Sequence, residues 1–287
     1  MRTLGIDVGG SFAKMGTVGS DTSAASLEMV ALPLQREWLA QRLQPQGGEV
    51  DQVLLTGAGA SQVKKWFPDQ RFCVVPELEA TGLGGAYLAD LDRCVVVNVG
   101  SGTPVLYVDK HGNQVEHLGG TGMGSASLGG LAHFLAGVTD LQEVGRAALG
   151  GDPDKVNLLV GDIYDDPSNV GLPSTTTASN FGKYQDWRKL KPEDHPSNDD
   201  LLAGLHTMVG QVIATIATAL ARGRCRPDAT LPIVVTGGGT LNPALVKYLR
   251  STFGFLNQEV VFPPKGEYGT LHGLFVKHNL LMYDTTR

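Results

Sequence analysis

The chain has 287 residues, of which 42% are hydrophobic and 18% charged, which is enough to build one large or two medium-sized domains. Its formal net charge of −6 at pH 7 disfavours a protein that binds nucleic acid without regard to sequence, because such proteins need a basic surface. The three cysteines, Cys73, Cys94 and Cys225, show neither a disulfide framework nor the spacing of a metal site.

The first predicted element is a strand at Thr3–Asp7, which leads through a glycine pair into a second strand at Ala13–Val18. Glycines let a turn bring its backbone amides close to an anion. Ser11 and Lys14 are within reach of phosphate oxygens, and Asp7 offers Mg²⁺ the oxygen ligand that this hard cation prefers. A plain hairpin with a solvent-exposed lysine explains the same residues, so both interpretations stay open on this motif alone.

The rest of the first half is predicted to alternate helices and strands. The expected strands are Gln52–Thr56 and Arg71–Val75, and the expected helices are Gln35–Leu43, Ala60–Trp66 and Glu77–Leu91. Glu77 begins the last helix directly after an apolar strand and Pro76, a position from which a side chain can face a cleft and act as a general base. An acid that only complements the helix dipole is the alternative.

The second half begins with a similar hairpin, in which the turn Gly100–Thr103 joins the strands Arg93–Val99 and Pro104–Asp109. Later elements are predicted as strands at Gln114–Leu118 and Pro232–Thr236 and helices at Ala126–Ala136, Asp140–Leu149, Asp199–Arg224, Asn242–Phe253 and Gly269–Met282. Residues 151–198 are rich in Asp, Pro, Ser, Thr and Lys, and we expect an irregular insertion with short helices. A third glycine turn, Gly237–Gly239, follows a strand and is expected near a base or ribose.

Three glycine turns in this order resemble the phosphate 1, phosphate 2 and adenosine motifs of the actin-like kinase superfamily. The resemblance implies an α/β fold of two actin-like (ribonuclease H-like) domains, residues 1–93 and 94–287, with ATP and Mg²⁺ in the cleft between them. Two similar halves that face each other would place a phosphate hairpin on either side of that cleft.

Four segments more closely resemble the type II pantothenate kinases. They are Gly5–Ser11 with Lys14, Pro76–Ala80 with Gly84, Asn98–Thr103 with Leu118–Gly124, and Thr177–Gly182. The last segment is the most specific, because ATP binding alone does not require it. The resemblance implies ATP-dependent phosphorylation of pantothenate to 4′-phosphopantothenate, the first step of coenzyme A biosynthesis.

The resemblance also assigns roles to residues of this chain. The catalytic residues would be Glu77, Lys14 and His117, and Asp7 would hold the metal. The nucleotide would be bound by Asp7, Gly9, Gly10, Ser11, Lys14, Gly100, Ser101, Gly102, Thr103, Gly122, Gly124, Gly237 and Gly238. The substrate would be contacted by Glu77, Ser101, His117, Gly119, Thr177, Ala178 and Asn180.

Two departures from the family pattern keep other functions open. His117 stands where the family has an arginine, and it lacks the permanent charged fork of that side chain. The glycines after Gly124 are partly replaced, giving Ser125-Ala126-Ser127. An actin-like kinase for another small alcohol, such as a sugar or a pantoate-like compound, and a nucleotide-binding regulator without productive phosphoryl transfer are the alternatives.

The family resemblance implies a homodimer formed through the second domain, and the helix from Asp199 could supply its face. A buried central helix explains the apolar stripe of that helix equally well. The N-terminus enters a predicted strand without a signal-peptide pattern, and we expect no apolar stretch to be long enough to span a bilayer. We therefore expect a cytoplasmic enzyme with a small-molecule substrate and no membrane or nucleic-acid partner.

Overall fold

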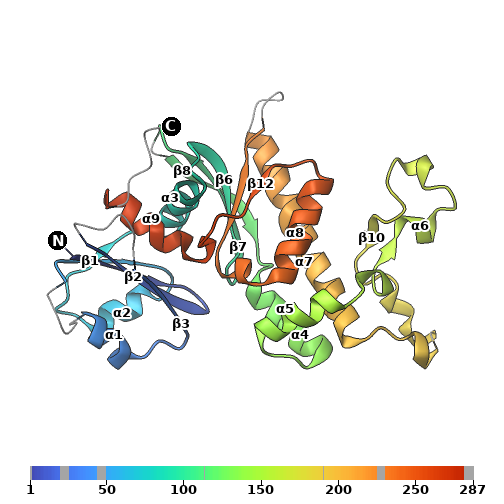
Figure 1. Cartoon of the computed structure of the whole chain (residues 1–287), viewed down its shortest axis with the longest axis horizontal. Helices are drawn as coiled ribbons and strands as arrows, with labels where there is room; N and C mark the ends of the chain where they lie inside the picture. Colours follow the sequence, from blue (N-terminus) through green and yellow to red (C-terminus); the bar gives the residue numbers. More distant parts are fainter. Residues whose placement is uncertain are drawn as a thin grey trace.

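The computed structural model describes residues 2–19, 26–43, 50–112, 114–189, 191–224 and 230–280, and its main elements are two five-stranded sheets flanked by helices (Figure 1). The first sheet contains β1 Arg2–Val8, β2 Phe12–Gly19, β3 Ser26–Ala31, β4 Gln52–Thr56 and β5 Cys73–Val74. The second contains β6 Arg93–Asn98, β7 Thr103–Asp109, β8 Gln114–Thr121, β11 Ile233–Thr236 and β12 Val260–Val261.

The α-helices are α1 Arg36–Leu43, α2 Ala60–Trp66, α3 Glu77–Ala89, α4 Ser125–Ala136, α5 Leu141–Gly150, α6 Val160–Ile163, α7 Asn198–Arg224, α8 Pro243–Phe255 and α9 Gly269–Lys277. Short 3₁₀ segments are η1 Pro153–Lys155, η2 Pro167–Val170, η3 Tyr184–Lys189, η4 Pro192–Asp194, η5 Gly238–Leu241 and η6 Gly266–Tyr268. Most predicted elements are present, with ends shifted by a few residues. The end of the predicted helix Gly269–Met282 lies outside the described residues.

Both sheets have the same topology, which confirms the prediction of two related α/β halves. The first has the order β3-β2-β1-β4-β5, and the second has the equivalent order β8-β7-β6-β11-β12. In each sheet the first three strands along the chain pair antiparallel, and the last two continue parallel to the first strand. The tight β1–β2 and β6–β7 turns therefore occupy equivalent positions.

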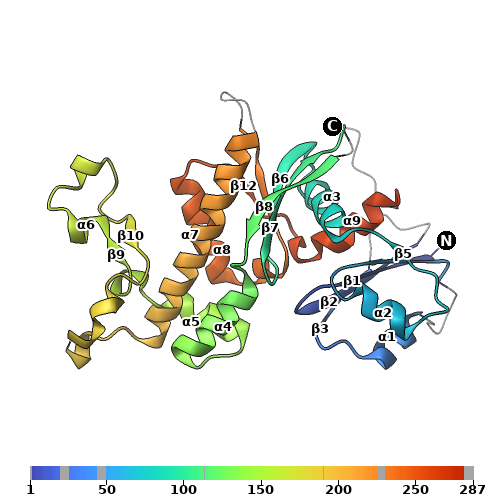
Figure 2. The ribbon, with the colours of Figure 1, turned by 180° about the vertical axis from the view of Figure 1, so that it is seen from behind.

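Helices α3 and α9 cross between the two sheets at very short distance (Figures 1 and 2). A Cβ atom on Gly84 would lie 1.8 Å from the carbonyl oxygen of Gly269, and one on Gly273 would lie 1.7 Å from that of Ala80. The side chains of Thr81 and Thr270 share a buried hydrogen bond of 2.9 Å across the same contact. The first residue of α3, which is Glu77, is thereby fixed relative to α9.

Helix α7 is the central helix of the second core. Its side chains Leu202, Leu205, Val209 and Ile213 are buried against the second sheet, so the predicted apolar stripe is covered within this chain. The expectation that no stretch is long enough for a bilayer was wrong, because α7 passes that test by length and composition. However, 72% of its most apolar 18-residue window is buried inside the protein, as is common for core helices.

Residues 151–198 form the expected irregular insertion, which extends from the second half away from the first sheet (Figures 1 and 2). It contains α6, the short 3₁₀ segments η1 to η4, and a two-stranded ribbon of β9 Leu158–Leu159 with β10 Thr177–Ser179. Asp200, at the start of α7, anchors the base of this insertion by accepting hydrogen bonds from the backbone amides of Asp152 and Ser197 and from Lys155 Nζ.

Candidate functional site

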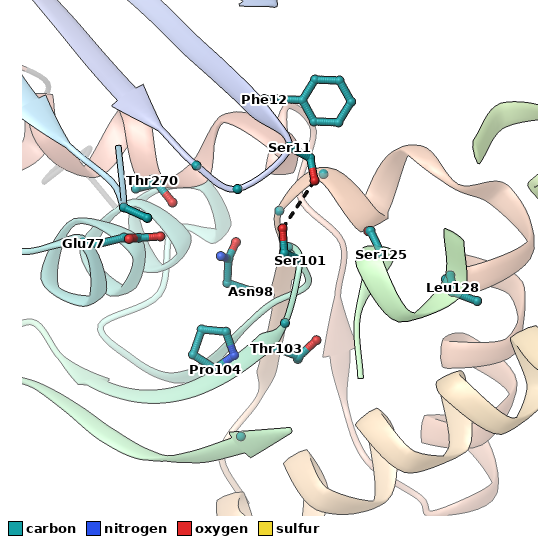
Figure 3. Close-up of a pocket in the computed structure, with 18 of the residues that line it drawn as sticks. Ser11, Phe12, Glu77, Asn98, Ser101, Thr103, Pro104, Ser125, Leu128 and Thr270 are labelled. Atoms are coloured by element: carbon teal, nitrogen blue, oxygen red, sulfur yellow. Dashed lines mark hydrogen bonds between the residues drawn. The ribbon is translucent and has the colours of Figure 1, made fainter. Parts of the chain in front are cut away.

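A cavity of about 740 Å³ lies where the two glycine hairpins face each other (Figure 3). The hydroxyl oxygens of Ser11 and Ser101, one from each hairpin, are 3.3 Å apart. A Cβ atom on Gly10 would lie 2.5 Å from Ser101 Oγ, so a side chain there would displace the Ser101 hydroxyl from this contact. Asp7 and Ser101 therefore share one cavity, as the prediction of opposed hairpins demands.

The first hairpin brings a buried carboxylate, Asp7, and a partly buried ammonium group, Lys14, to the cavity. Asp7 and Lys14 are direct partners in the β1–β2 ladder, and Lys14 Nζ lies 3.5 Å from Asp7 Oδ2. Burial raises the pKa of the Asp7 carboxyl, and the positive charge of Lys14 opposes that rise. Lys14 thus favours an ionised carboxylate beside the space where phosphate charge would be placed.

Asp7 fits a magnesium site that is completed by water and phosphate oxygens. In the described part of the chain, no group of three or more His, Cys, Asp or Glu side chains could hold a metal ion. Mg²⁺ commonly keeps several waters and binds through one or two carboxylates plus substrate phosphates. A single carboxylate beside a glycine turn fits that mode of binding.

Glu77 reaches the cavity from the first turn of α3 (Figure 3). Partial burial raises the pKa of its carboxyl, the negative charge of Asp7 adds to the rise, and Lys14 lowers it. Glu79, two residues further along, instead forms an ion pair of 2.6 Å with Lys277 of α9. The two acids therefore point to different surroundings, as their helical spacing predicts.

The second hairpin is held by its own backbone and by the start of α4. The Gly100 amide donates to the Gly102 carbonyl at 2.9 Å, and the Ser125 amide donates to the Gly100 carbonyl at 2.8 Å. Thr103 Oγ1 donates to the Met123 carbonyl at 2.7 Å. Ser125 is the first residue of α4 and lines the cavity, so a helix N-terminus adds its preference for anions to this side.

The third glycine turn, Gly237–Gly239, packs against the second hairpin. Gly237 has φ +92°, and a Cβ atom there would lie 2.5 Å from the Val99 carbonyl oxygen, so only glycine suits the position. Beyond the turn the cavity is lined by the side chains of Leu128, Leu141, Gln142, Leu241 and Asn242. This partly apolar end, with Leu128 across the Ser11–Ser101 contact from Glu77 (Figure 3), has the character expected for a nucleoside.

His117 lies on β8 and lines the cavity with an exposed side chain. Gly119 and Gly120 on the same strand also line it, and Gly119 has φ +148°, next to a register shift in the β7–β8 ladder. The cavity therefore continues from the hairpins along the edge of the second sheet, where an acceptor molecule could lie.

Fifteen of the predicted site residues line this one cavity. They are Asp7, Gly9, Gly10, Ser11, Lys14, Glu77, Gly100, Ser101, Gly102, Thr103, His117, Gly119, Gly122, Gly237 and Gly238. Gly124 instead packs behind the hairpin, where a Cβ atom would lie 2.6 Å from the Ser101 carbonyl oxygen.

The predicted substrate residues Thr177, Ala178 and Asn180 do not line the cavity. They belong to β10 and the residue after it, in the insertion beyond α7 (Figure 1). Asn180 Nδ2 donates to Gln211 Oε1 of α7 at 3.0 Å, whereas its buried Oδ1 has no hydrogen-bond partner among the residues that the structure describes. Within one chain, these residues are thus separated from the hairpins.

Several cavity residues were not predicted from the sequence. Thr270 follows Gly269 at the start of α9, and Gln142 and Asn242 lie at the starts of α5 and α8. Asn98 ends β6, and its Oδ1 accepts a hydrogen bond from Thr236 Oγ1 at 3.2 Å. Its position at the end of a buried strand was a usable signal, whereas the other three depend on tertiary packing.

Comparisons with known proteins agree with this geometry. A family model described as Fumble matches residues 87–227. The type II pantothenate kinase of Staphylococcus aureus (strain USA300) is 30% identical over 252 residues, which cover 85% of this chain and 87% of that protein. The type II pantothenate kinase of Bacillus anthracis is 28% identical over 227 residues, or 76% and 78% of the two chains.

Solved structures share the fold at low sequence identity. Component A of the (R)-2-hydroxyglutaryl-CoA dehydratase of Acidaminococcus fermentans has a TM-score of 0.63 at 16% identity, covering 98% of this chain and 99% of that one. A ROK family glucokinase from Streptomyces griseus, in complex with glucose and AMPPNP, has a TM-score of 0.54 at 15% identity, covering 96% and 98%. These likenesses support the predicted actin-like fold.

Proposed function

The chain belongs to the type II pantothenate kinase family, and from that premise we propose that it transfers the γ-phosphoryl group of ATP to pantothenate. The product is 4′-phosphopantothenate, and the reaction is the first step of coenzyme A biosynthesis. The observation that carries the proposal is the convergence of two glycine hairpins and Glu77 on one cavity. Phosphoryl transfer depends mainly on positioning and on neutralising charge, and this arrangement offers both.

The triphosphate is proposed to lie between the two hairpins. Lys14 and the amides of the first turn would contact the β- and γ-phosphates, and the turn Gly100–Thr103 would contact them from the opposite half. A Mg²⁺ ion, held by Asp7 through water, would neutralise charge on the phosphates. The nucleoside would extend past Gly237 and Gly238 toward the partly apolar end of the cavity.

The acceptor hydroxyl is proposed to lie between Glu77 and the γ-phosphate. Glu77 would accept the hydroxyl proton as the oxygen forms its bond to phosphorus, and ADP would leave with the electron pair of the broken bond. His117 lies on β8, next to β7 of the second hairpin, and its imidazole would hydrogen-bond the acceptor or the developing charge. It would fill the role of the family's arginine without that residue's permanent charge.

The names of the relatives favour pantothenate over a sugar or another alcohol, and they favour an active kinase over a nucleotide-binding regulator. We further propose that the enzyme works in the cytoplasm on a small-molecule substrate, without a nucleic-acid or membrane partner. The acidic net charge of −6 supports the absence of a nucleic-acid partner. We propose that the chain has two domains, residues 1–93 and 94–287. Helix α9 of the second then returns to pack on the sheet of the first.

A homodimer is proposed because the insertion exposes apolar side chains and holds the predicted substrate segment away from its own cavity. Ile163, Tyr164, Val170 and Leu172 are 38–51% exposed there. Surface patches of apolar side chains are typical of interfaces between chains. In a dimer, Thr177–Asn180 of one copy could approach the cavity of the other and complete its substrate site.

ADP release measured with and without pantothenate tests the kinase proposal. We expect ADP and phosphorylated pantothenate in equal amounts, identified by mass spectrometry, and little ADP without the acceptor. ADP release that does not depend on pantothenate would instead identify an ATPase, and a product formed only from another alcohol would change the substrate.

Light scattering tests the dimer, and mixing two inactive variants tests whether its sites are shared. Glu77→Gln and Asn180→Ala remove groups that would lie in one composite site but on different copies. We expect the mixture to regain part of the activity after subunit exchange. A monomer, or a dimeric mixture that stays inactive, contradicts the proposal.

A further inference from the structure

A buried histidine contacts the nucleoside end of the cavity through one asparagine. His206 lies in α7 and is 0% exposed, and its Nε2 lies 3.0 Å from Nδ2 of Asn242, which lines the cavity. None of the sequence motifs includes either residue. The pair therefore joins the core helix of the second half to the wall of the site.

The hydrogen bonds of His206 fix the position of its proton. Nδ1 lies 2.7 Å from the carbonyl oxygen of Leu202, which can only accept, so Nδ1 carries the hydrogen. Burial lowers the pKa of His206, which favours the neutral ring. Nε2 is therefore a pure acceptor, and it requires the amide nitrogen of Asn242, rather than its oxygen, to face it.

This orientation leaves the Asn242 oxygen free to hold the start of α8. Asn242 Oδ1 accepts a hydrogen bond of 3.0 Å from the Leu245 amide, which makes Asn242 the N-cap of that helix. The backbone N–H of Asn242 donates a hydrogen bond of 3.1 Å to the Gly239 carbonyl, so the residue is also tied to the third glycine turn.

Helix α5 also packs against the Asn242 side chain. A Cβ atom on Gly145 of α5 would lie 2.8 Å from Asn242 Oδ1, so α5 packs directly against the oxygen. The first turn of α5 carries Leu141 and Gln142, which line the same end of the cavity. Asn242 thus contacts α5, α7, α8 and the glycine turn, and its two side-chain hydrogen bonds fix which way its amide group faces.

We propose that His206 is a positioning residue that fixes Asn242, and with it the wall of the cavity that receives the nucleoside of ATP. This proposal rests on the proposed function, because it takes the cavity to be the ATP site. Its specific content is that loss of the His206 acceptor weakens binding of the nucleoside portion, while the phosphate end at Asp7, Lys14 and Ser101 is unchanged.

Three variants test this proposal. His206→Leu removes the acceptor, and His206→Gln restores an acceptor oxygen close to the Nε2 position. Thr207→Val is the matched control, because Thr207 is the next residue of α7 and makes a buried hydrogen bond of 2.9 Å to the Ala203 carbonyl. This variant perturbs the same helix, and the hydrogen bond that it removes goes to the backbone of that helix rather than to Asn242.

We expect His206→Leu to weaken ATP and ADP binding by the same factor of about tenfold, measured by calorimetry. In turnover the KM for ATP should rise while kcat and the KM for pantothenate stay near the wild-type values. His206→Gln and Thr207→Val should bind both nucleotides normally. Unchanged nucleotide binding in His206→Leu, or equal losses in Thr207→Val, would overturn the proposal.

The ¹⁵N shifts of His206 in the wild-type protein give a second test that does not require a folded variant. We expect a neutral ring with its proton on Nδ1 and a signal that moves when ADP is added. A proton on Nε2, or no response to bound ADP, would contradict the role of His206. Failure of the wild-type protein to bind ATP would instead contradict the proposed function.

Discussion

Replacing Glu77 by glutamine tests the proposed general base with little change of shape. Of the described residues that line the cavity, Asp7 and Glu77 carry carboxyl groups, and Asp7 is engaged with Lys14. Glutamine keeps the length of the side chain but cannot take up the hydroxyl proton. Removal of a general base costs about 10² to 10⁴ in rate, which corresponds to about 3 to 5 kcal/mol in activation free energy.

The structure supplies a matched control for this variant in the same turn of α3. Glu79→Gln also removes one negative charge, but Glu79 pairs with Lys277 rather than facing the cavity. We expect Glu77→Gln to lose kcat by about 10² or more while ATP binding, measured by calorimetry, stays within about threefold of wild type. Glu79→Gln should keep kcat.

The pH dependence of kcat/KM gives an independent test of Glu77 as the general base. Partial burial and the charge of Asp7 raise the pKa of Glu77, so the active, ionised form is lost as the pH falls through that raised pKa. The acid limb should therefore lie above the pH of an ordinary glutamate, and Glu77→Gln should lack this limb in its residual rate. A Glu77→Gln enzyme with the wild-type kcat would refute the assignment.

The remaining predictions concern stability and the acceptor end of the site. Gly273→Ala should lower the free energy of unfolding by about 3 kcal/mol in urea titrations, because its Cβ would lie 1.7 Å from the Ala80 carbonyl oxygen. Gly130→Ala in α4 should instead raise it by about 1 kcal/mol, because the added carbon would meet no described atom within 4 Å beyond its own helix turn; equal losses would contradict the packing argument. Burial raises the pKa of Asp200, but hydrogen bonds from the backbone amides of Asp152 and Ser197 and from Lys155 outweigh it and lower the pKa from 3.8 to about 2. The ionised carboxylate should therefore contribute about 2 kcal/mol to the free energy of unfolding above pH 4, and this is lost as the pH falls toward 2. In Asp200→Asn the free energy of unfolding should lack this pH-dependent contribution. An acid unfolding transition identical to that of the wild type would contradict the role of Asp200. His117→Arg should change the KM for pantothenate without changing ATP binding, and an effect on ATP alone would place His117 elsewhere.

Local sequence was enough to predict the parts of the site that lie next to a strand end. Asp7 lies near the end of buried β1 and Ser101 follows buried β6, and the glycines beside them mark tight turns, so the opposed hairpins could be expected. β3 was missed because it is an edge strand whose residues 26–31 are exposed or half-buried, and they give only a weak strand signal.

Residues that depend on long-range packing could not be predicted. Thr270 reaches the cavity only because α9 returns to α3 across a glycine contact, and Asn242 does so only because α5 and α7 enclose it. The segment Thr177–Asn180 could be recognised by resemblance, but its distance from the cavity reflects how the insertion folds. No local pattern encodes that direction.

The two ends of the cavity are built by different physical means, and this difference predicts how they respond to substitution. At the phosphate end, the absence of side chains at Gly10 and Gly237 permits close approach: a side chain at Gly237 collides with the Val99 backbone, and one at Gly10 displaces the Ser101 hydroxyl. At the nucleoside end, side-chain hydrogen bonds of His206 and Asn242 fix the wall. A substitution that keeps the donor and acceptor pattern is tolerated there, because the constraint is chemical rather than steric. Phosphate binding should therefore be lost by adding atoms, and nucleoside binding by removing a single acceptor.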